Sequence, residues 1–325
     1  MLALELIDSG LLLARRHGES SEVLTEAPGV AVLDDEKTRT GNDAANRVRL
    51  MPLLAHTNFW RALSTDELTR PSRLVRTTAD VAFAQAEALL GPHKAGGEGV
   101  LLAVPAGYSR EQLALLLGVI NETGVRVAGL VDAALAACSL EPAPARVLHL
   151  DLELHQAILT VLEYTGGERS GLKRSRYEIA LRHGVLDLQQ TLMQLIADTF
   201  IRKTRFDPLH DASTEQRLVD QLPDLLGRLR EQEQVVVGMQ FGDRPLEIEI
   251  ERAQVIAALE PHYVELLRLV QGARVAGMQI QLRLAPRIAA FPGLVERFGT
   301  LRDCEIQLLP RGAAAFGTLQ QEAAI

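Results

Sequence analysis

Four ionisable side chains recur at alternate positions in one stretch of this 325-residue chain. His149, Asp151, Glu153 and His155 are separated by single leucines, so a continuous β-strand would place all four on one face. Imidazole and carboxylate groups gathered in this way are ligands that a divalent metal takes. The spacing matches no established zinc motif, and a polar cleft face or a turn that scatters the side chains is the alternative. We therefore predict no metal site here.

Two further aspartates stand where an apolar segment meets a turn or a helix. Asp8 opens the turn Asp8-Ser9-Gly10, and Asp132 precedes an alanine-rich segment. Asp8 and Asp151 are the candidate ligands of a water-bridged magnesium ion, whereas the role we favour for both is to satisfy turn amides. For Asp132 we predict a helix-start residue rather than a catalyst.

The elements that must position these side chains follow from the apolar periodicity. Val147 to Glu163 has the alternation of a strand, and Gly166-Gly167 has the composition of a hairpin turn. Other strands are expected at residues 2–7, 11–14, 29–33, 99–104, 125–130, 174–180, 235–241, 246–250, 278–284 and 306–309. Helices are expected at residues 42–54, 77–90, 110–123, 132–138, 185–205, 214–233 (interrupted by Pro223), 252–270 and 294–298. This alternation predicts an α/β fold.

Composition narrows the class of function. A net charge of -8 argues against broad binding to nucleic acid, which needs a basic face. The two cysteines, Cys138 and Cys304, lack metal-ligand spacing and favour a reducing compartment. Residues 1–13 are interrupted by acids and lack a basic start, so no signal peptide is predicted, and no run has the length of a membrane span. We expect a cytoplasmic protein that is not inserted in a membrane.

Several segments carry a family resemblance in their order along the chain. They are residues 40–45 (Thr-Gly-Asn-Asp-Ala-Ala), 101–106 (Leu-Leu-Ala-Val-Pro-Ala), 108–112 (Tyr-Ser-Arg-Glu-Gln), 286–288 (Pro-Arg-Ile) and 291–294 (Phe-Pro-Gly-Leu). Their order resembles the actin, hexokinase and heat-shock-70 ATPase superfamily, most closely the nucleotide-binding domain of heat-shock-70 chaperones. The resemblance implies a two-lobed actin-like fold of duplicated ribonuclease-H-like domains. Lobe I would be residues 1–145 and lobe II residues 146–325, with a helical and hairpin subdomain at about 184–251 and no substrate-binding domain.

The departures from this family fall in its phosphate loops. The first family loop is Asp-x-Gly-Thr, and here leucine replaces the hydroxyl residue in Asp8-Ser-Gly-Leu11. The second is Asp-x-Gly-Gly-Gly-Thr, but here Asp151-Leu-Glu-Leu-His-Gln156 keeps only the aspartate, so bulky and acidic groups stand where amides would approach phosphate. The degenerate nucleotide cleft implied by the resemblance consists of Asp8, Ser9, Gly10, Leu11, Asp132, Asp151, Glu153, His155, Gln156, Arg283, Pro286 and Arg287.

These departures predict a pseudo-ATPase that acts as a protein-interaction module, with no catalytic residue and no cofactor. The partner would be a protein that the sequence does not identify, and the oligomeric state stays open. One alternative is a divergent ATPase or chaperone-like protein that binds ATP or ADP with magnesium. Another is an actin-like cytoplasmic scaffold of the pilus-assembly or cell-division type. Phe59 and Trp60 are expected either to anchor a partner or to pack inside the first lobe.

Overall fold

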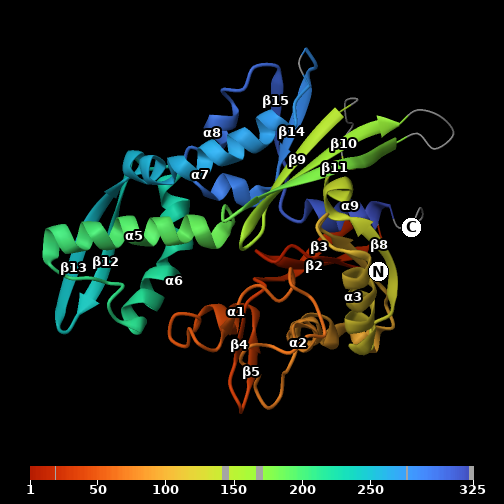
Figure 1. The fold of residues 1–325 in the computed structure, drawn as a ribbon, viewed down its shortest axis with the longest axis horizontal. Coiled ribbons are helices and arrows are strands. Elements are labelled where there is room, and N and C mark those ends of the chain that lie inside the picture. The colour runs from red at the N-terminus through yellow and green to blue at the C-terminus, as the bar shows by residue number, and fades with distance from the viewer. Residues whose placement is uncertain (19, 141–145, 166–170, 276, 322–325) are drawn as a thin grey trace. The chain divides into compact units, whose positions relative to one another are not determined.

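Two five-stranded sheets with the same order of strands organise this mixed α/β chain (Figure 1). The computed structural model describes residues 1–18, 20–140, 146–165, 171–275 and 277–321, so the predicted turn at Gly166-Gly167 lies outside the described residues. The chain divides into two compact units. Unit 1 comprises Met1–His149, Thr160–Tyr177 and Leu309–Ile325, and unit 2 comprises Leu150–Leu159 and Glu178–Leu308.

The sheet of unit 1 has the order β3-β2-β1-β7-β8. Its strands are β1 (Leu2–Glu5), β2 (Leu11–His17), β3 (Ser20–Ala27), β7 (Val100–Val104) and β8 (Val127–Asp132). β1 pairs antiparallel with β2 and parallel with β7, and β7 pairs parallel with β8. Every residue of β1 and β7 is buried, which matches the unbroken apolar sequence of β7 and the apolar Leu2, Ala3 and Leu4 of β1; the buried Glu5 is the exception.

Short helices and a small second sheet complete unit 1. The helices are α1 (Gly41–Ala45), α2 (Thr78–Leu90), the 3-10 helix η1 (Gly91–Gly96), α3 (Arg110–Glu122), α4 (Ala133–Cys138) and α9 (Ala313–Gln320). The small sheet joins β4 (Ala31–Leu33), β5 (Thr38–Thr40) and β6 (Ala55–His56). Capping boxes at Thr77 and Ser109 fix the starts of α2 and α3, because each hydroxyl accepts from the backbone N–H three residues on.

The sheet of the second half has the order β11-β10-β9-β14-β15. Its strands are β9 (Arg146–Leu152), β10 (Gln156–Thr165), β11 (Gly171–Leu181), β14 (Ile280–Leu284) and β15 (Cys304–Leu308). Unit 2 adds α5 (Val185–Thr204), α6 (Ala212–Leu229), α7 (Arg252–Gly272), η2 (Pro286–Ala290), α8 (Leu294–Phe298) and the hairpin of β12 (Gln234–Phe241) and β13 (Arg244–Glu251).

Three expectations from periodicity are wrong. The predicted helix at 42–54 is only the short α1, because Leu50 and Leu53 on its intended apolar stripe are exposed and packing does not extend it. Pro223 does not interrupt α6, since the buried leucine stripe of this helix compensates for one lost backbone hydrogen bond. The segment 147–163 is two strands joined by a turn at residues 153–155, so the four alternating ionisable side chains do not share one strand face.

Phe59 and Trp60 lie inside unit 1, each with 2% of its surface exposed. The Trp60 indole N–H donates to Gln85 Oε1 at 2.7 Å, which satisfies its one polar atom in the core. Of the two expectations for this pair, packing is therefore correct and partner anchoring is wrong. Within the described residues, none of the helices combines the length and the apolar character that crossing a membrane requires.

Candidate functional site

In unit 1, three segments of interest leave the sheet at one edge. Because β1, β7 and β8 run parallel, the chain that follows each of them emerges on the same side. The segments contain Asp8, Pro105 and Asp132 respectively. This edge, beyond the carboxyl ends of parallel strands, is where α/β sheets bind ligands. The structure thus places both Asp8 and Asp132 at this edge.

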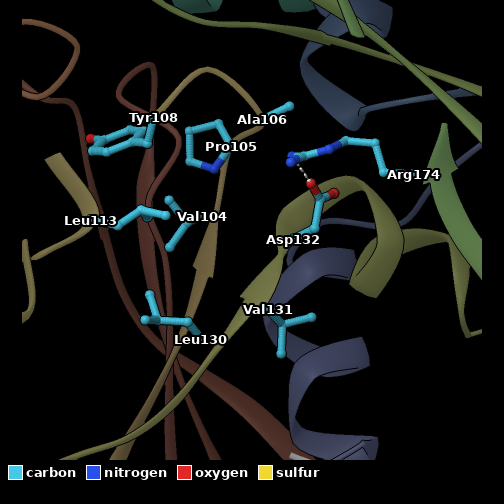
Figure 2. A pocket seen from close by; sticks show the side chains of 9 residues that line it. All are labelled: Val104, Pro105, Ala106, Tyr108, Leu113, Leu130, Val131, Asp132 and Arg174. Carbon is cyan, nitrogen blue, oxygen red and sulfur yellow. Dashed lines mark hydrogen bonds and ion pairs between the residues drawn. The ribbon is translucent and has the colours of Figure 1, made fainter. Parts of the chain in front are cut away.

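A pocket of about 210 Å³ opens at this edge beside β7 and β8 (Figure 2). Val104, Leu113 and Leu130 give it an apolar side, and Pro105 and Tyr108 continue that lining. Tyr108 donates its hydroxyl hydrogen to the carbonyl oxygen of Trp60 at 2.9 Å, so the phenol is fixed to the core. The pocket therefore has a preformed apolar wall.

Asp132 lies at the opposite side of this pocket. As predicted, it starts helix α4, and its Oδ1 accepts from the backbone N–H of Leu135 at 3.0 Å. Its Oδ2 forms an ion pair with Arg174 of β11, which points toward it in Figure 2. Both oxygens of the Asp132 carboxylate are therefore already paired, one with the N-terminus of α4 and the other with the Arg174 guanidinium.

The turn at residues 8–10 of unit 1, the Asp8 turn, has its own carboxylate close by. The N–H of Gly10 donates to the carbonyl of Ile7 at 2.9 Å, and Asp8 is 4% exposed. A Cβ placed on Gly10 would lie 2.7 Å from Oε1 of Glu26, so the glutamate carboxylate occupies the space that this glycine leaves open. Arg311 donates to the other oxygen of Glu26 at 2.6 Å.

Ser9 and Leu11 complete the predicted residues of the Asp8 turn. Ser9 is half-buried, and Leu11 is fully buried at the start of β2. Leu11 thus belongs to the apolar core and offers no hydroxyl to a ligand.

In unit 2, Asp151 is held by an arginine. Nη1 of Arg287, in η2, lies 2.8 and 2.9 Å from the two carboxylate oxygens of Asp151. The two side chains are only 16% and 10% exposed, so this is a mostly buried ion pair. Pro286 precedes Arg287 as the first residue of η2 and fixes its entry. Sequence reasoning placed Asp151, Pro286 and Arg287 in one site, and the structure brings them together.

The rest of the turn at residues 151–156, the Asp151 turn, closes on itself. The N–H of Glu153 donates to the carbonyl of Gln156 at 2.8 Å, and the Gln156 amide donates to Oε2 of Glu153 at 2.6 Å. Gly184 packs so closely that a Cβ on it would lie 2.4–2.6 Å from backbone atoms of Glu153, Leu154 and Gln156. Atoms of the turn itself and of Gly184 therefore fill the space inside the Asp151 turn.

The carbonyls of the Asp151 turn are also used by the chain that follows β11. The backbone N–H groups of Val185 and Leu186 donate to the carbonyls of Glu153 and Leu154, each at 2.9 Å. Arg182 donates its backbone N–H to the carbonyl of His155 at 3.0 Å, and the His155 side chain is half-buried. The start of α5 thus locks this turn in one conformation.

Arg283 belongs to β14, within the strand expected at residues 278–284. It is fully buried, its register partner on β15 is Gln307, and its Nε donates to Oε1 of Gln281 at 2.8 Å. A buried guanidinium needs several acceptors, so Arg283 is a structural residue of the sheet.

Three residues that contact the candidate site residues were not predicted from the sequence: Glu26, Arg174 and Arg311. Glu26 lies on β3, a strand that was not predicted, and its partner Arg311 is 285 positions away. Arg174 was placed on a strand, but its pairing with Asp132 joins residues 42 apart. Each pairing joins residues that are far apart in the sequence and meet only in the folded chain, so it leaves no local signal in the sequence.

A histidine pair forms a second polar cluster in unit 2. Nδ1 of His183 lies 2.9 Å from Nδ1 of His262 on α7, and Nε2 of His262 lies 3.0 Å from the hydroxyl of Thr191 on α5. Burial, with the neighbouring His183, lowers the pKa of His262, while Asp187 opposes this shift. The cluster joins α5 to α7 and favours a neutral His262 imidazole.

Among the described residues, no three histidine, cysteine, aspartate or glutamate side chains are grouped as ligands for a metal ion. His149 and Asp151 lie on β9, whereas Glu153 and His155 lie in the turn. The alternative in which a turn scatters these four residues is therefore the correct one.

Neither protein-family models nor curated proteins give a match to this chain.

Proposed function

We propose that this chain is a heat-shock-70-like protein of the two-lobed actin-like ATPase fold whose nucleotide site is degenerate, and that it acts as a protein-interaction module. The shared strand order of the two sheets supports this proposal. In each, the first three strands along the chain lie consecutively and the last two follow beside the first. A duplicated ribonuclease-H-like fold would have this repetition, and the segment order of the sequence resembles the same superfamily.

The observation that carries the pseudo-ATPase assignment is that each turn corresponding to a phosphate loop has its own carboxylate–arginine pair. Glu26 and Arg311 stand at the Asp8 turn, and Asp151 and Arg287 stand at the Asp151 turn. A phosphate entering the Asp8 turn would meet the Glu26 carboxylate, and one entering the Asp151 turn would meet Glu153, which is 5% exposed and accepts from the Gln156 amide. Each charged hydrogen bond lost in this way removes about 1.5–3 kcal/mol, so several together weaken nucleotide binding by orders of magnitude.

The Asp151 turn adds a steric argument. Phosphate cradles need backbone N–H groups that point into open space. Here the N–H of Glu153 is bonded to Gln156, and Gly184 is packed against the backbone of the turn. Opening this turn for a triphosphate would break the buried contacts of Asp151 with Arg287 as well.

Titration calorimetry with magnesium-ATP and magnesium-ADP tests the proposal. We expect no binding with a Kd below about 1 mM. Micromolar binding with turnover that Asp151→Ala abolishes would overturn the pseudo-ATPase assignment in favour of a divergent ATPase. Asp224→Ala is the matched control, because Asp224 is a 77% exposed carboxylate on α6 of the same unit.

A further inference from the structure

The pocket beside β7 and β8 is too small for a nucleotide. Its volume of about 210 Å³ lies below the range of about 300–1,000 Å³ that pockets for whole small molecules occupy. Its apolar side, formed by Val104, Leu113 and Leu130, suits one apolar side chain. Pockets of this kind are where protein interfaces place their anchor residues.

The charge at the other side of the pocket is unevenly exposed. The Asp132 side chain is 13% exposed and capped by α4, whereas the side chain of its partner Arg174 is 40% exposed. An incoming group therefore meets the guanidinium more than the carboxylate. Arg174 also stacks on Tyr177, with its central carbon 5.8 Å from the ring centroid, and this holds the guanidinium in place.

Arg174 is part of a cationic strip. Arg174 and Arg176 lie on the same face of β11 and are both exposed, Lys173 is exposed on the opposite face, and residues 171–177 contain no acid. The strip stands out in a chain whose net charge is -8. β11 is also the terminal strand in the order of its sheet, so the strip lies at an edge where an extended segment can be reached.

We propose that the pocket and the cationic strip together bind an acidic segment of a partner protein that carries one apolar anchor residue. The anchor enters between Val104, Leu113 and Leu130, and the flanking carboxylates pair with Arg174 and Arg176 on β11. The inference rests on the proposed function, since it names the kind of partner that the interaction module takes. An anionic polymer without an anchor would use the strip and leave the pocket empty.

Fluorescence polarisation of the full chain with a labelled acidic hexapeptide containing one central phenylalanine tests this proposal. We expect a Kd below about 1 mM and at least tenfold weaker binding after Arg174→Glu. Leu113→Glu, in the half-buried wall, should weaken binding to a similar degree. Arg70→Glu, which reverses an exposed charge elsewhere in unit 1, should leave the Kd within about twofold and is the matched control.

Two matched peptides give the outcomes that overturn the inference. If the peptide with glycine in place of phenylalanine binds equally well, the strip acts alone and the pocket has no role. If the peptide with glutamines in place of its acids binds equally well, the charge argument fails. Absence of binding by the parent peptide at 1 mM refutes the whole inference. Micromolar binding of magnesium-ATP would overturn only the proposed function, because the peptide assay contains no nucleotide.

Discussion

Gly317→Ala is expected to destabilise unit 1 even though alanine is the better helix residue. Gly317 lies inside α9 and faces α4. A Cβ at this position would be 1.9 Å from the carbonyl oxygen of Ala136 and 2.6 Å from its carbonyl carbon. That oxygen already accepts from the backbone N–H and the hydroxyl of Ser139 at 3.1 and 2.7 Å. The methyl group therefore meets fixed backbone.

Two opposing effects decide the magnitude. Replacing glycine by alanine inside a helix ordinarily stabilises by about 0.5–1 kcal/mol. A carbon–oxygen approach of about 3.3 Å is the usual lower limit, so α4 and α9 would have to separate by about 1.4 Å. Overpacking of this kind costs about 1–3 kcal/mol or more, and the Ser139 contacts weaken with it. A separation of about 1.4 Å puts the overpacking cost at about 3 kcal/mol, so the expected net result is a loss of about 2–2.5 kcal/mol.

Urea unfolding followed by tryptophan fluorescence measures this loss. Trp60 is the chain's single tryptophan and lies in the core of unit 1, so its signal reports the unit that contains α4 and α9. The matched control is Gly118→Ala in α3, where the added methyl group has no neighbour within 4 Å. This control variant should raise the urea concentration at the midpoint of unfolding. If Gly317→Ala raises the midpoint as much as Gly118→Ala at an unchanged slope, the packing argument is refuted.

Three further predictions concern unit 2. Arg287→Met should lower the free energy of unfolding of unit 2 by about 3–5 kcal/mol, because it leaves the Asp151 carboxylate charged and unpaired. The double variant Arg287→Met/Asp151→Leu should regain most of this stability, as measured by amide hydrogen exchange. Additive losses from the two substitutions would contradict the buried ion pair. The free energy of unfolding of unit 2 should fall as pH drops below about 6.5, because unfolding frees His262 to take up a proton that its lowered pKa resists. The variant His262→Gln should flatten this dependence on pH, and an unchanged slope would contradict the argument. Gly184→Ala should lower the free energy of unfolding by about 3 kcal/mol or more, because the added methyl group forces the Asp151 turn open. Limited proteolysis measures this effect, and a variant that resists the protease as well as the unchanged chain would count against the prediction.

The sequence predicted those elements whose signals are local. Ser109 and the leucine stripe after it specify α3, an unbroken apolar run specifies β7, and Leu2, Ala3 and Leu4 specify most of β1. By contrast, β3 has the polar sequence of an exposed edge strand, and its pairing with β2 is what makes it a strand. Edge position is a property of the whole sheet, so periodicity along the chain could not reveal it.

The same distinction holds for the candidate site. Asp132 as a helix start follows from the alanines after it, and the structure agrees. The closed form of the Asp151 turn depends on Gly184 and Arg287, which arrive from elsewhere in the chain. Sequence reasoning named Arg287 only through a resemblance and had no means to pair it with Asp151. Partners of charged groups are set by tertiary structure, which a linear pattern does not encode.

Helix α9 has a consequence for how the protein is made. It packs on α4 and on strands β1, β2 and β7, so the last helix of the described chain touches the first strands. During synthesis on a ribosome, β1 and β2 emerge long before residues 313–320 are translated. Until then the face of the sheet that α9 covers is uncovered, and Ala3, Leu12 and Ala14 lack their packing contact with Leu319. The apolar face that α9 covers is therefore the last part of unit 1 to be completed during translation.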